Sequence, residues 1–471
     1  MKKKFFFLNF FLILLSVFFF SLKIWLFRYF GNVDLDQLLI FFNFGFKGLL
    51  DAEDYVIKKF YQICILLPIL ISIILTVLLK YLRINEKITI WSSSIFFVIS
   101  ITYLSIQLDF NNTHFTQSSN DYFKTNYKRP ILNSIKSSQT DLLIVYLESF
   151  EENYLETYEL KKDVLTDISF ENLKSKKINY FEQTKYNNYT IGGIVSSQCG
   201  IPQKKIGILD TRLMFNENNK RKHTKLFFGL KNFLPNAICL SDILKFNGYK
   251  NFFIHSIGSK FQAMDVFLED HNYEIVFDKN YFIKNGYKNL NSWGNGVNDV
   301  QLFNKAKNLI DELKDKNQRF NLSILTTDTH APGYIDQSCP FKNLDVSSLE
   351  ISVKCTALSL NYFINHIYKK YGDTISIVII GDHLYPLDNN EKKQRYIYNR
   401  IITKKKMNRN KITHYDLFPS LLHLVNLDYG NHLGLGHSFL SKKIDVDYDL
   451  YLNELKNNIK KESKYYYEFW N

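Results

Sequence analysis

Long apolar runs dominate the first 110 residues of the chain. The first run covers Phe5–Phe27 and is almost wholly apolar up to Phe20, and the second covers Tyr61–Leu79. A third, shorter run covers Ile90–Ile106. A membrane-spanning helix needs about 20 mostly apolar residues. We therefore expect residues 1–110 to form a membrane anchor with about three transmembrane helices.

Charged residues around these runs predict their orientation. Basic residues precede the first run and separate the second from the third: Lys2, Lys3, Lys4, Lys80, Arg83 and Lys87. The intervening loop carries acids: Asp34, Asp36, Asp51, Glu53 and Asp54. The positive-inside rule places the N-terminus and residues 80–89 in the cytoplasm, and the chain after about Ile106 outside it. A cleaved signal peptide is the alternative for the first run, but that run is long and no small-x-small site follows. Polar residues interrupt Leu35–Leu50, which we interpret as an interfacial segment.

Beyond a polar stretch at 111–139, interpreted as a linker, short apolar runs alternate with helical patterns. The runs have the continuous hydrophobicity of strands that are buried on both faces: Leu142–Leu147, Phe252–Ile254, Leu322–Thr329 and Ile375–Gly381. Helical patterns lie between them, at Leu240–Phe246, Val300–Leu313 and Leu358–Lys370. This order predicts an α/β domain at 140–445 with a mostly parallel central sheet and helices on both faces. Residues 446–471 are expected to form a helical tail.

Polar side chains close or directly follow each of the four predicted strands. They are Glu148, His255, Asp328 with His330, and Asp382 with His383. A single residue of this kind often caps the next helix. Ligands of open α/β sheets bind beyond the carboxyl ends of the strands, so four such strand ends together predict one functional site.

The residue types at these strand ends suit metal-assisted chemistry. Two carboxylates and an imidazole, from Glu148, Asp382 and His383, match Mn²⁺, Zn²⁺ or Mg²⁺. Thr190, in the stretch NNYTIGGIVSSQCGIP, fits either an ordinary helix N-cap or a nucleophile at a helix N-terminus whose glycines let a phosphate approach. Because a metal would lower the pKa of its hydroxyl, we expect Thr190 to be a fourth ligand and the attacking group. His330 and His255 would hold phosphate oxygens or protonate a leaving group.

Charge and cysteine content agree with an exterior domain near a membrane. The net charge is +13, but the basic residues are scattered and no nucleic-acid-binding motif is visible, so we expect no nucleic-acid partner. Cys64 lies in an apolar run, and the other four cysteines lie in the predicted exterior domain. An even number there suggests two disulfides, and proximity favours Cys199–Cys239 and Cys339–Cys355 over four buried thiols.

Four motifs together carry a family resemblance: LLIVYLESFE, TIGGIVSSQCGIP, TTDTHAPG and VIIGDHLYP. In this combination the chain resembles the phosphoglycerol transferase I and lipoteichoic acid synthase-like branch of the alkaline phosphatase/sulfatase superfamily, over about residues 140–440. The resemblance implies one divalent cation, Mn²⁺ by preference, held by Glu148, Thr190, Asp382 and His383. It also implies that Thr190 takes up phosphoglycerol covalently.

The resemblance further implies that His330 contacts the substrate and that Lys260 and Phe261 contact the glycerol phosphate. We add Trp293 as a residue that shapes the substrate pocket. The donor in the family is phosphatidylglycerol, diacylglycerol is released, and the acceptor is a glycan or polyol phosphate, such as a periplasmic glucan. A multi-pass protein of the bacterial inner membrane, with its catalytic domain outside, is the matching location.

Other functions fit the sequence less well. A sulfatase that matures a formylglycine needs a C/S-x-P-x-R motif, where this chain has TIGGI. A two-metal phosphatase needs a second ligand set, to which Asp328 alone is an obvious contributor. A phosphoethanolamine transferase would use the same threonine and metal and is the main alternative. A membrane-anchored scaffold would not need the intact set of ligands.

Overall fold

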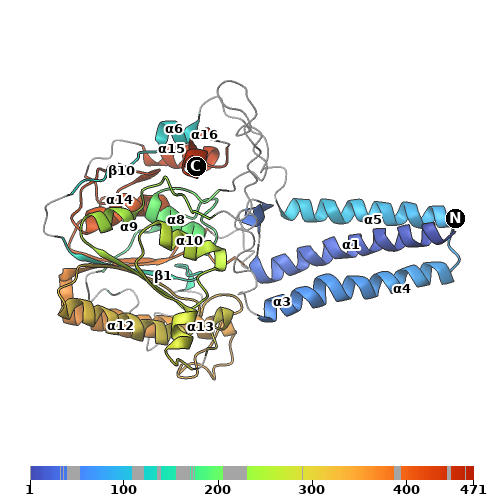
Figure 1. Ribbon diagram of the computed structural model, residues 1–471, viewed down its shortest axis with the longest axis horizontal. Helices are drawn as coiled ribbons and strands as arrows, with labels where there is room; N and C mark the ends of the chain where they lie inside the picture. The colour runs from blue at the N-terminus through green and yellow to red at the C-terminus, as the bar shows by residue number, and fades with distance from the viewer. Residues whose placement is uncertain are drawn as a thin grey trace. The chain divides into compact units, whose positions relative to one another are not determined.

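The computed structural model describes residues 2–31, 33–35, 37–39, 54–108, 121–134, 139–154, 170, 173, 175–204, 231–288, 290–386, 394–442, 447–461 and 463–470. The chain divides into two compact units (Figure 1). The first consists mainly of Met1–Leu39 and Ala52–Phe115, and we call it the anchor unit. The second contains most of the chain after Thr116, and we call it the α/β unit.

The anchor unit is built from long apolar helices. They are α1 (Lys2–Phe30), α3 (Asp54–Phe60), which continues through the π-helical turn η1 (Tyr61–Leu66) into α4 (Leu67–Tyr81), and α5 (Glu86–Gln107). Among the described residues, three stretches are long and apolar enough to cross a membrane: Lys4–Phe30, Val56–Tyr81 and Glu86–Ile106. α1 packs against both α4 and α5. These stretches contain the three predicted apolar runs, whereas most of the interfacial segment predicted at Leu35–Leu50 lies outside the described residues.

A mostly parallel sheet forms the centre of the α/β unit. In the described part of the chain it has seven strands, in the order β2-β8-β7-β1-β6-β4-β5. The parallel strands are β1 (Asp141–Leu147), β4 (Lys250–His255), β5 (Ile275–Phe277), β6 (Phe320–Leu325) and β7 (Ile375–Gly381). The antiparallel strands are β8 (Asn399–Ile402) and β2 (Ser175–Lys176). The predicted parallel α/β fold is therefore confirmed.

Helices cover both faces of this sheet (Figure 1). One core lies between the sheet and α8 (Thr190–Cys199), α9 (Leu240–Phe246) and α14 (Leu417–Leu424). The other lies between the sheet and α12 (Asp299–Asp315) and α13 (Ser348–Tyr371). In α12 the apolar side chains recur every three or four residues, so one face of this helix can be buried against the sheet. These side chains are Leu302, Phe303, Ala306, Leu309, Ile310 and Leu313.

The remaining elements are short and lie around these layers. The helices are α6 (Tyr122–Asn126), α10 (Met264–Asp270), α11 (Lys279–Lys284), α15 (Tyr448–Asn458) and α16 (Lys464–Glu468). The strands are β3 (Tyr180–Phe181), β9 (Lys411–Ile412), β10 (His432–Leu433) and β11 (Gly436–His437).

Part of the segment interpreted as a linker is folded, and that interpretation is wrong for residues 121–127. α6 lies within it, and Phe123 is fully buried in the core of the α/β unit. Asp121 caps α6 and also accepts hydrogen bonds from Ser463 Oγ (2.6 Å) and Tyr465 N (3.1 Å). The polar local sequence gave no sign of this packing, because the partners of residues 121–127 come from the far end of the chain.

Candidate active site

Two neighbouring strands bring the predicted metal ligands together. Glu148 follows β1, while Asp382 and His383 follow β7, and Leu147 pairs with Gly381 at the end of this parallel ladder. One ligand atom from each of the three residues lies within 4.8 Å of the others. His383 Nε2 is 3.4 Å from Glu148 Oε1 and 3.5 Å from Asp382 Oδ2.

The electrostatics of this group fit a bound cation. Asp382 is fully buried, and its Oδ2 has no hydrogen-bond partner among the described residues. Burial and the neighbouring Glu148 charge raise the pKa of Asp382 to about 7. Burial also opposes ionisation of Glu148, but His383 lowers the pKa of Glu148 to about 2. Burial alone would lower the pKa of His383, yet the two carboxylates raise it to about 9. Two buried carboxylates with an unpartnered oxygen and an imidazole are a suitable donor set for a divalent cation.

Thr190 lies at this group of ligands, at the start of α8. Its hydroxyl donates a hydrogen bond to Glu148 Oε2 at 3.2 Å, and the residue is 8% exposed. Residues that are far apart in the sequence thus place a hydroxyl beside two carboxylates and an imidazole. Figure 1 places α8 over the sheet that contains β1.

The two glycines after Thr190 have a different role from the predicted one. A Cβ on Gly193 would lie 2.2 Å from the backbone oxygen of Asp382, and one on Gly192 would lie 2.2 Å from the backbone oxygen of Tyr186. The prediction that they make room for a phosphate is therefore wrong. Gly193 lets the backbone of α8 pack directly on Asp382, and Gly192 lets it pack on Tyr186, so that Thr190 reaches the candidate metal ligands.

The start of α8 also differs from the prediction. The helix begins at Thr190 and Tyr189 is its N-cap, one residue earlier than expected. The backbone N–H of Ile191, in the first turn of α8, donates to Gln262 Oε1 at 3.0 Å. Gln262 has a φ of 54° and is a site residue that the sequence analysis missed.

Ser149 is a second missed residue. Its backbone N–H donates to Asp382 Oδ1 (2.8 Å), and its hydroxyl donates to Glu148 Oε1 (2.7 Å). It therefore orients both carboxylates. Its place directly after Glu148 was visible in the sequence, but its left-handed φ of 52°, which turns the side chain back to the site, was not.

The predicted substrate-binding residues are distributed differently around the site. The His330 ring stacks on Trp293 with centroids 4.4 Å apart, and Trp293 packs edge-on against Phe261 at 4.8 Å. His330 is half-buried. Lys260, next to Phe261, is exposed. The substrate contacts of these residues stay predictions.

His255 and Asp328 lie at their strand ends but are enclosed by protein. His255 is fully buried, and its Nε2 is 3.1 Å from Ser259 Oγ. Burial lowers the pKa of His255 to about 4, which favours the neutral imidazole. β6 ends at Leu325, earlier than the predicted strand. Asp328 therefore lies on the following loop, where its Oδ2 accepts a hydrogen bond from Asp299 N at 2.9 Å.

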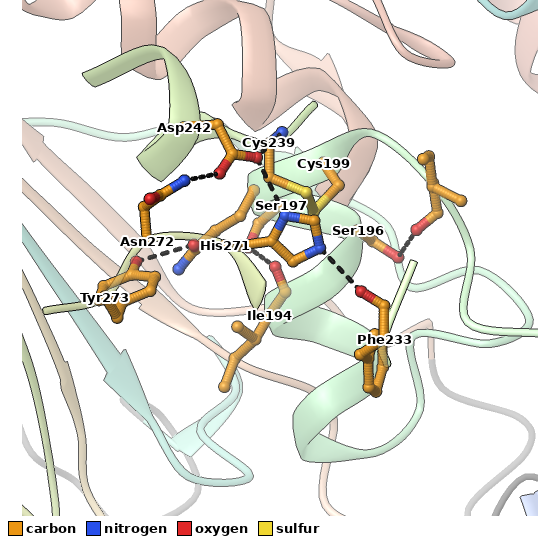
Figure 2. Close-up of a disulfide and its surroundings, with 12 residues drawn as sticks. Ile194, Ser196, Ser197, Cys199, Phe233, Cys239, Asp242, His271, Asn272 and Tyr273 are labelled. Carbon is orange, nitrogen blue, oxygen red and sulfur yellow. Dashed lines mark hydrogen bonds and ion pairs between the residues drawn. A yellow bond between two sulfur atoms is a disulfide. The ribbon is translucent and has the colours of Figure 1, made fainter. Parts of the chain in front are cut away.

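A disulfide between Cys199 and Cys239 ties the last residue of α8 to the N-cap of α9 (Figure 2). Beside it, His271 Nδ1 lies 2.9 Å from Asp242 Oδ2, and His271 Nε2 lies 3.0 Å from the carbonyl oxygen of Phe233. Cys239, Asp242 and His271 are close enough to hold a metal, but the sulfur of Cys239 is committed to the disulfide.

The second disulfide joins Cys339 to Cys355. Both pairings are those that sequence proximity favoured. Of the two bridges, Cys199–Cys239 includes a residue of the helix that begins at Thr190, whereas Cys355 lies within α13.

The fold and the site together define an alkaline phosphatase-like α/β domain with a buried hydroxyl beside a candidate cation site. Residues 140–427, more than half of the chain, match the Sulfatase family. The protein therefore belongs to the sulfatase family, as the resemblance in its motifs implied.

Similar proteins extend this comparison. Phosphoglycerol transferase I from Escherichia coli O127:H6 is 31% identical over 275 residues, which cover 56% of this chain and 33% of that protein. Its counterpart in Escherichia fergusonii is 30% identical over 282 residues, covering 57% and 34%. The matched segment thus spans about a third of the length of these curated relatives. A solved alkaline phosphatase superfamily protein from Vibrio parahaemolyticus shares the fold, with a TM-score of 0.50, 17% identity, and coverage of 71% of this chain and 77% of that one.

Proposed function

We propose that this protein is a membrane-anchored transferase that moves phosphoglycerol from phosphatidylglycerol to a glycan or glycerol hydroxyl. The observation that carries the proposal is the hydrogen bond of 3.2 Å between the Thr190 hydroxyl and Glu148, next to Asp382 and His383. A buried hydroxyl in this position suits a nucleophile better than a helix cap, because its partner is a carboxylate of the candidate cation site and not a backbone N–H. The similarity of this segment to phosphoglycerol transferases supports the choice of transferred group.

Four residues would hold the reacting centre. Glu148, Asp382 and His383 would bind one divalent cation, with Mn²⁺ as the first candidate and Zn²⁺ or Mg²⁺ as alternatives. When bound, the cation would supply positive charge that favours the Thr190 alkoxide and offsets the charge that develops on the phosphoryl group. Glu148 orients the Thr190 hydroxyl through the hydrogen bond already present.

The transfer then takes two steps. Thr190 Oγ forms a bond to phosphorus, and the bond from phosphorus to the diacylglycerol oxygen breaks. His330 protonates that oxygen, the proton of the Thr190 hydroxyl passes to solvent, and His330 regains a proton from solvent. In the second step the acceptor hydroxyl attacks the same phosphorus, the bond to Thr190 breaks, and the acceptor proton returns to Thr190. The stacked Trp293 and His330 would form an aromatic wall for the glycerol phosphate, with Lys260 as an exposed cation.

The anchor unit fits a lipid donor. We propose that its three long apolar helices span the bacterial inner membrane, with the N-terminus and the turn between α4 and α5 in the cytoplasm. The α/β unit would then lie on the periplasmic or extracellular side. Its two disulfides support this side, because disulfides persist in oxidising compartments.

Diacylglycerol release and a trapped adduct test the proposal together. Full-length protein supplied with phosphatidylglycerol and a divalent cation should release diacylglycerol, and Thr190→Ala should lower the rate by a factor of about 10³ or more. Thr125→Ala, at an exposed position on α6, is the matched control and should retain the wild-type rate. Mass spectrometry of the Thr190 peptide should show a phosphoglycerol adduct when no acceptor is present. Equal rates in Thr190→Ala and wild type would reject Thr190 as the nucleophile. A phosphoethanolamine adduct formed in a parallel reaction with phosphatidylethanolamine, with no adduct from phosphatidylglycerol, would reject phosphatidylglycerol as the donor.

A further inference from the structure

A second site lies in the anchor unit, at the end where α1 and α5 begin and α4 finishes. A cavity of about 740 Å³ is present there. Its lining comes from the three helices and the turn that joins α4 to α5. A cavity of this volume is in the range that holds a lipid-sized ligand group.

The walls of this cavity are of two kinds. The start of α1 supplies aromatic rings, and Phe7 is 60% exposed, which suits contact with acyl chains. Buried polar side chains also line the cavity: Asn9 Oδ1 accepts a hydrogen bond of 2.6 Å from Ser93 Oγ, and the hydroxyls of Thr76 and Thr89 donate to backbone carbonyls one turn earlier in the chain. A ligand with a polar head and apolar chains matches both kinds of wall.

Two cations stand at the opening without an acidic partner. Lys80 and Arg83 are exposed, and among the described residues neither lies within ion-pair distance of a carboxylate. Lys80 Nζ lies 5.5 Å from the centroid of the Phe6 ring, so the cation sits directly against the aromatic wall. Glu86 is the one acid in the lining, and no ion pair joins it to Lys80 or Arg83. Basic pockets between transmembrane helices bind acidic lipid head groups through this kind of charge complementarity.

We infer that this cavity binds one acidic phospholipid, with its phosphate at Lys80 and Arg83 and its chains along the aromatic start of α1. The site differs from the proposed catalytic one. The chain leaves the cavity through α5 and reaches Gln107 about 30 Å further along that helix before it continues to the α/β unit. The inference rests on the proposed membrane insertion, and with the proposed orientation the lipid belongs to the cytoplasmic leaflet. It does not depend on the transfer reaction.

Photo-crosslinking in lipid nanodiscs tests the inference. Full-length Thr190→Ala protein would be placed in nanodiscs that contain a photoactivatable phosphatidylglycerol, and crosslinked peptides would be mapped by mass spectrometry. We expect crosslinks in residues 73–91, and Lys80→Gln/Arg83→Gln should reduce them on the order of 10-fold. Arg28→Gln/Lys58→Gln removes two exposed cations elsewhere in the anchor unit and should change them less than about twofold. Lys80→Arg/Arg83→Lys, which keeps both charges, should restore the signal.

Further arms separate this lipid from other occupants. A photoactivatable phosphatidylcholine should label residues 73–91 clearly less than phosphatidylglycerol does, and soluble glycerol phosphate should not compete with the lipid. Equal labelling of wild type and Lys80→Gln/Arg83→Gln, or equal labelling by phosphatidylcholine, would overturn the inference. Protein–protein crosslinks at residues 73–91 in place of lipid crosslinks would also overturn it, because the occupant would then be a second copy of the chain. Since Thr190→Ala is used throughout, loss of these crosslinks is distinguishable from failure of the catalytic proposal.

Discussion

Two pairs of buried carboxylates lie near the carboxyl ends of the central strands, and their surroundings differ. Asp299 is surrounded by protein donors, because its Oδ1 accepts from Thr327 N (2.9 Å) and its Oδ2 from Thr356 Oγ1 (2.6 Å). Its neighbour Asp328 accepts from the Asp299 backbone. The pair of Glu148 and Asp382 instead meets an imidazole and a hydroxyl, from His383 and Thr190.

Within each pair, the repulsion between the two carboxylates is reduced in a different way. Burial raises the pKa of Asp299 to about 6, and burial with the Asp299 charge raises the pKa of Asp328 well above its usual range. This pair therefore tends to keep a proton. In the other pair His383 holds Glu148 ionised, while Asp382 has an unpartnered oxygen. Buried acids alone thus do not identify a cation site; the imidazole, the free oxygen and the nearby hydroxyl do.

Replacing one acid of each pair by its neutral amide should give the largest difference in diacylglycerol release. Asp382→Asn should lower diacylglycerol release by a factor of about 10³ or more, because it removes a charge that the cation requires. Asp328→Asn should stay within about tenfold of wild type, because asparagine resembles the protonated acid in shape and charge. Steady-state rates at saturating phosphatidylglycerol measure both. Equal losses in the two variants would mean that the pairs have the same role.

The disulfides should differ in a similar way, with a smaller effect. Cys199→Ser/Cys239→Ser releases the far end of α8 from α9, and a small shift of Thr190 should lower kcat by about 10- to 100-fold. Cys339→Ser/Cys355→Ser should lower thermal stability with kcat within about threefold. A comparison of kcat with the apparent Tm of each variant separates positioning from stability. The account fails here if kcat falls equally in both variants.

Removal of the cation should lower the apparent Tm through the pair of Glu148 and Asp382 alone. At a cation concentration about 100 times Kd, binding adds about 2.7 kcal/mol to the free energy of unfolding. Chelation should therefore lower the apparent Tm by about 2–4 °C, and added Mn²⁺ should restore it. Asp382→Asn should abolish this difference, whereas Asp328→Asn should keep it. A chelator effect that persists in Asp382→Asn would place the cation elsewhere.

The smallest expected effect is the pH dependence of the Tm difference between cation-loaded and chelated protein. Because the pKa of Asp382 is raised to about 7, its proton stabilises the cation-free protein at low pH, and this stabilisation is lost as pH rises through about 7. A cation needs the deprotonated carboxylate, so its affinity should increase over the same range. The difference in Tm between cation-loaded and chelated protein should widen from pH 5 to pH 8. Thermal unfolding at several pH values measures it, and a difference that narrows would contradict the assignment.

Part of the site could be predicted from the sequence alone. The strand ends were predictable because Glu148, Asp382 and His383 directly follow unbroken apolar runs. Asp328 follows a similar run, but β6 ends early and its loop turns toward Asp299, which no local pattern indicates.

The supporting contacts were equally hidden. Ser149 and Gln262 reach the site through left-handed backbone conformations. A side chain at Gly193 would collide with the backbone of Asp382, which lies almost two hundred residues further along the chain. These features depend on tertiary packing. The types of the reacting groups could therefore be predicted, but not the contacts that hold them in place.

The most direct test of the central claim is anomalous diffraction from crystals of the protein grown with Mn²⁺. The account predicts one peak bonded to Glu148, Asp382 and His383, with Thr190 Oγ beside it. A peak between Asp299 and Asp328, or a Mn²⁺ ion at the first pair with Thr190 turned away from it, would contradict the account.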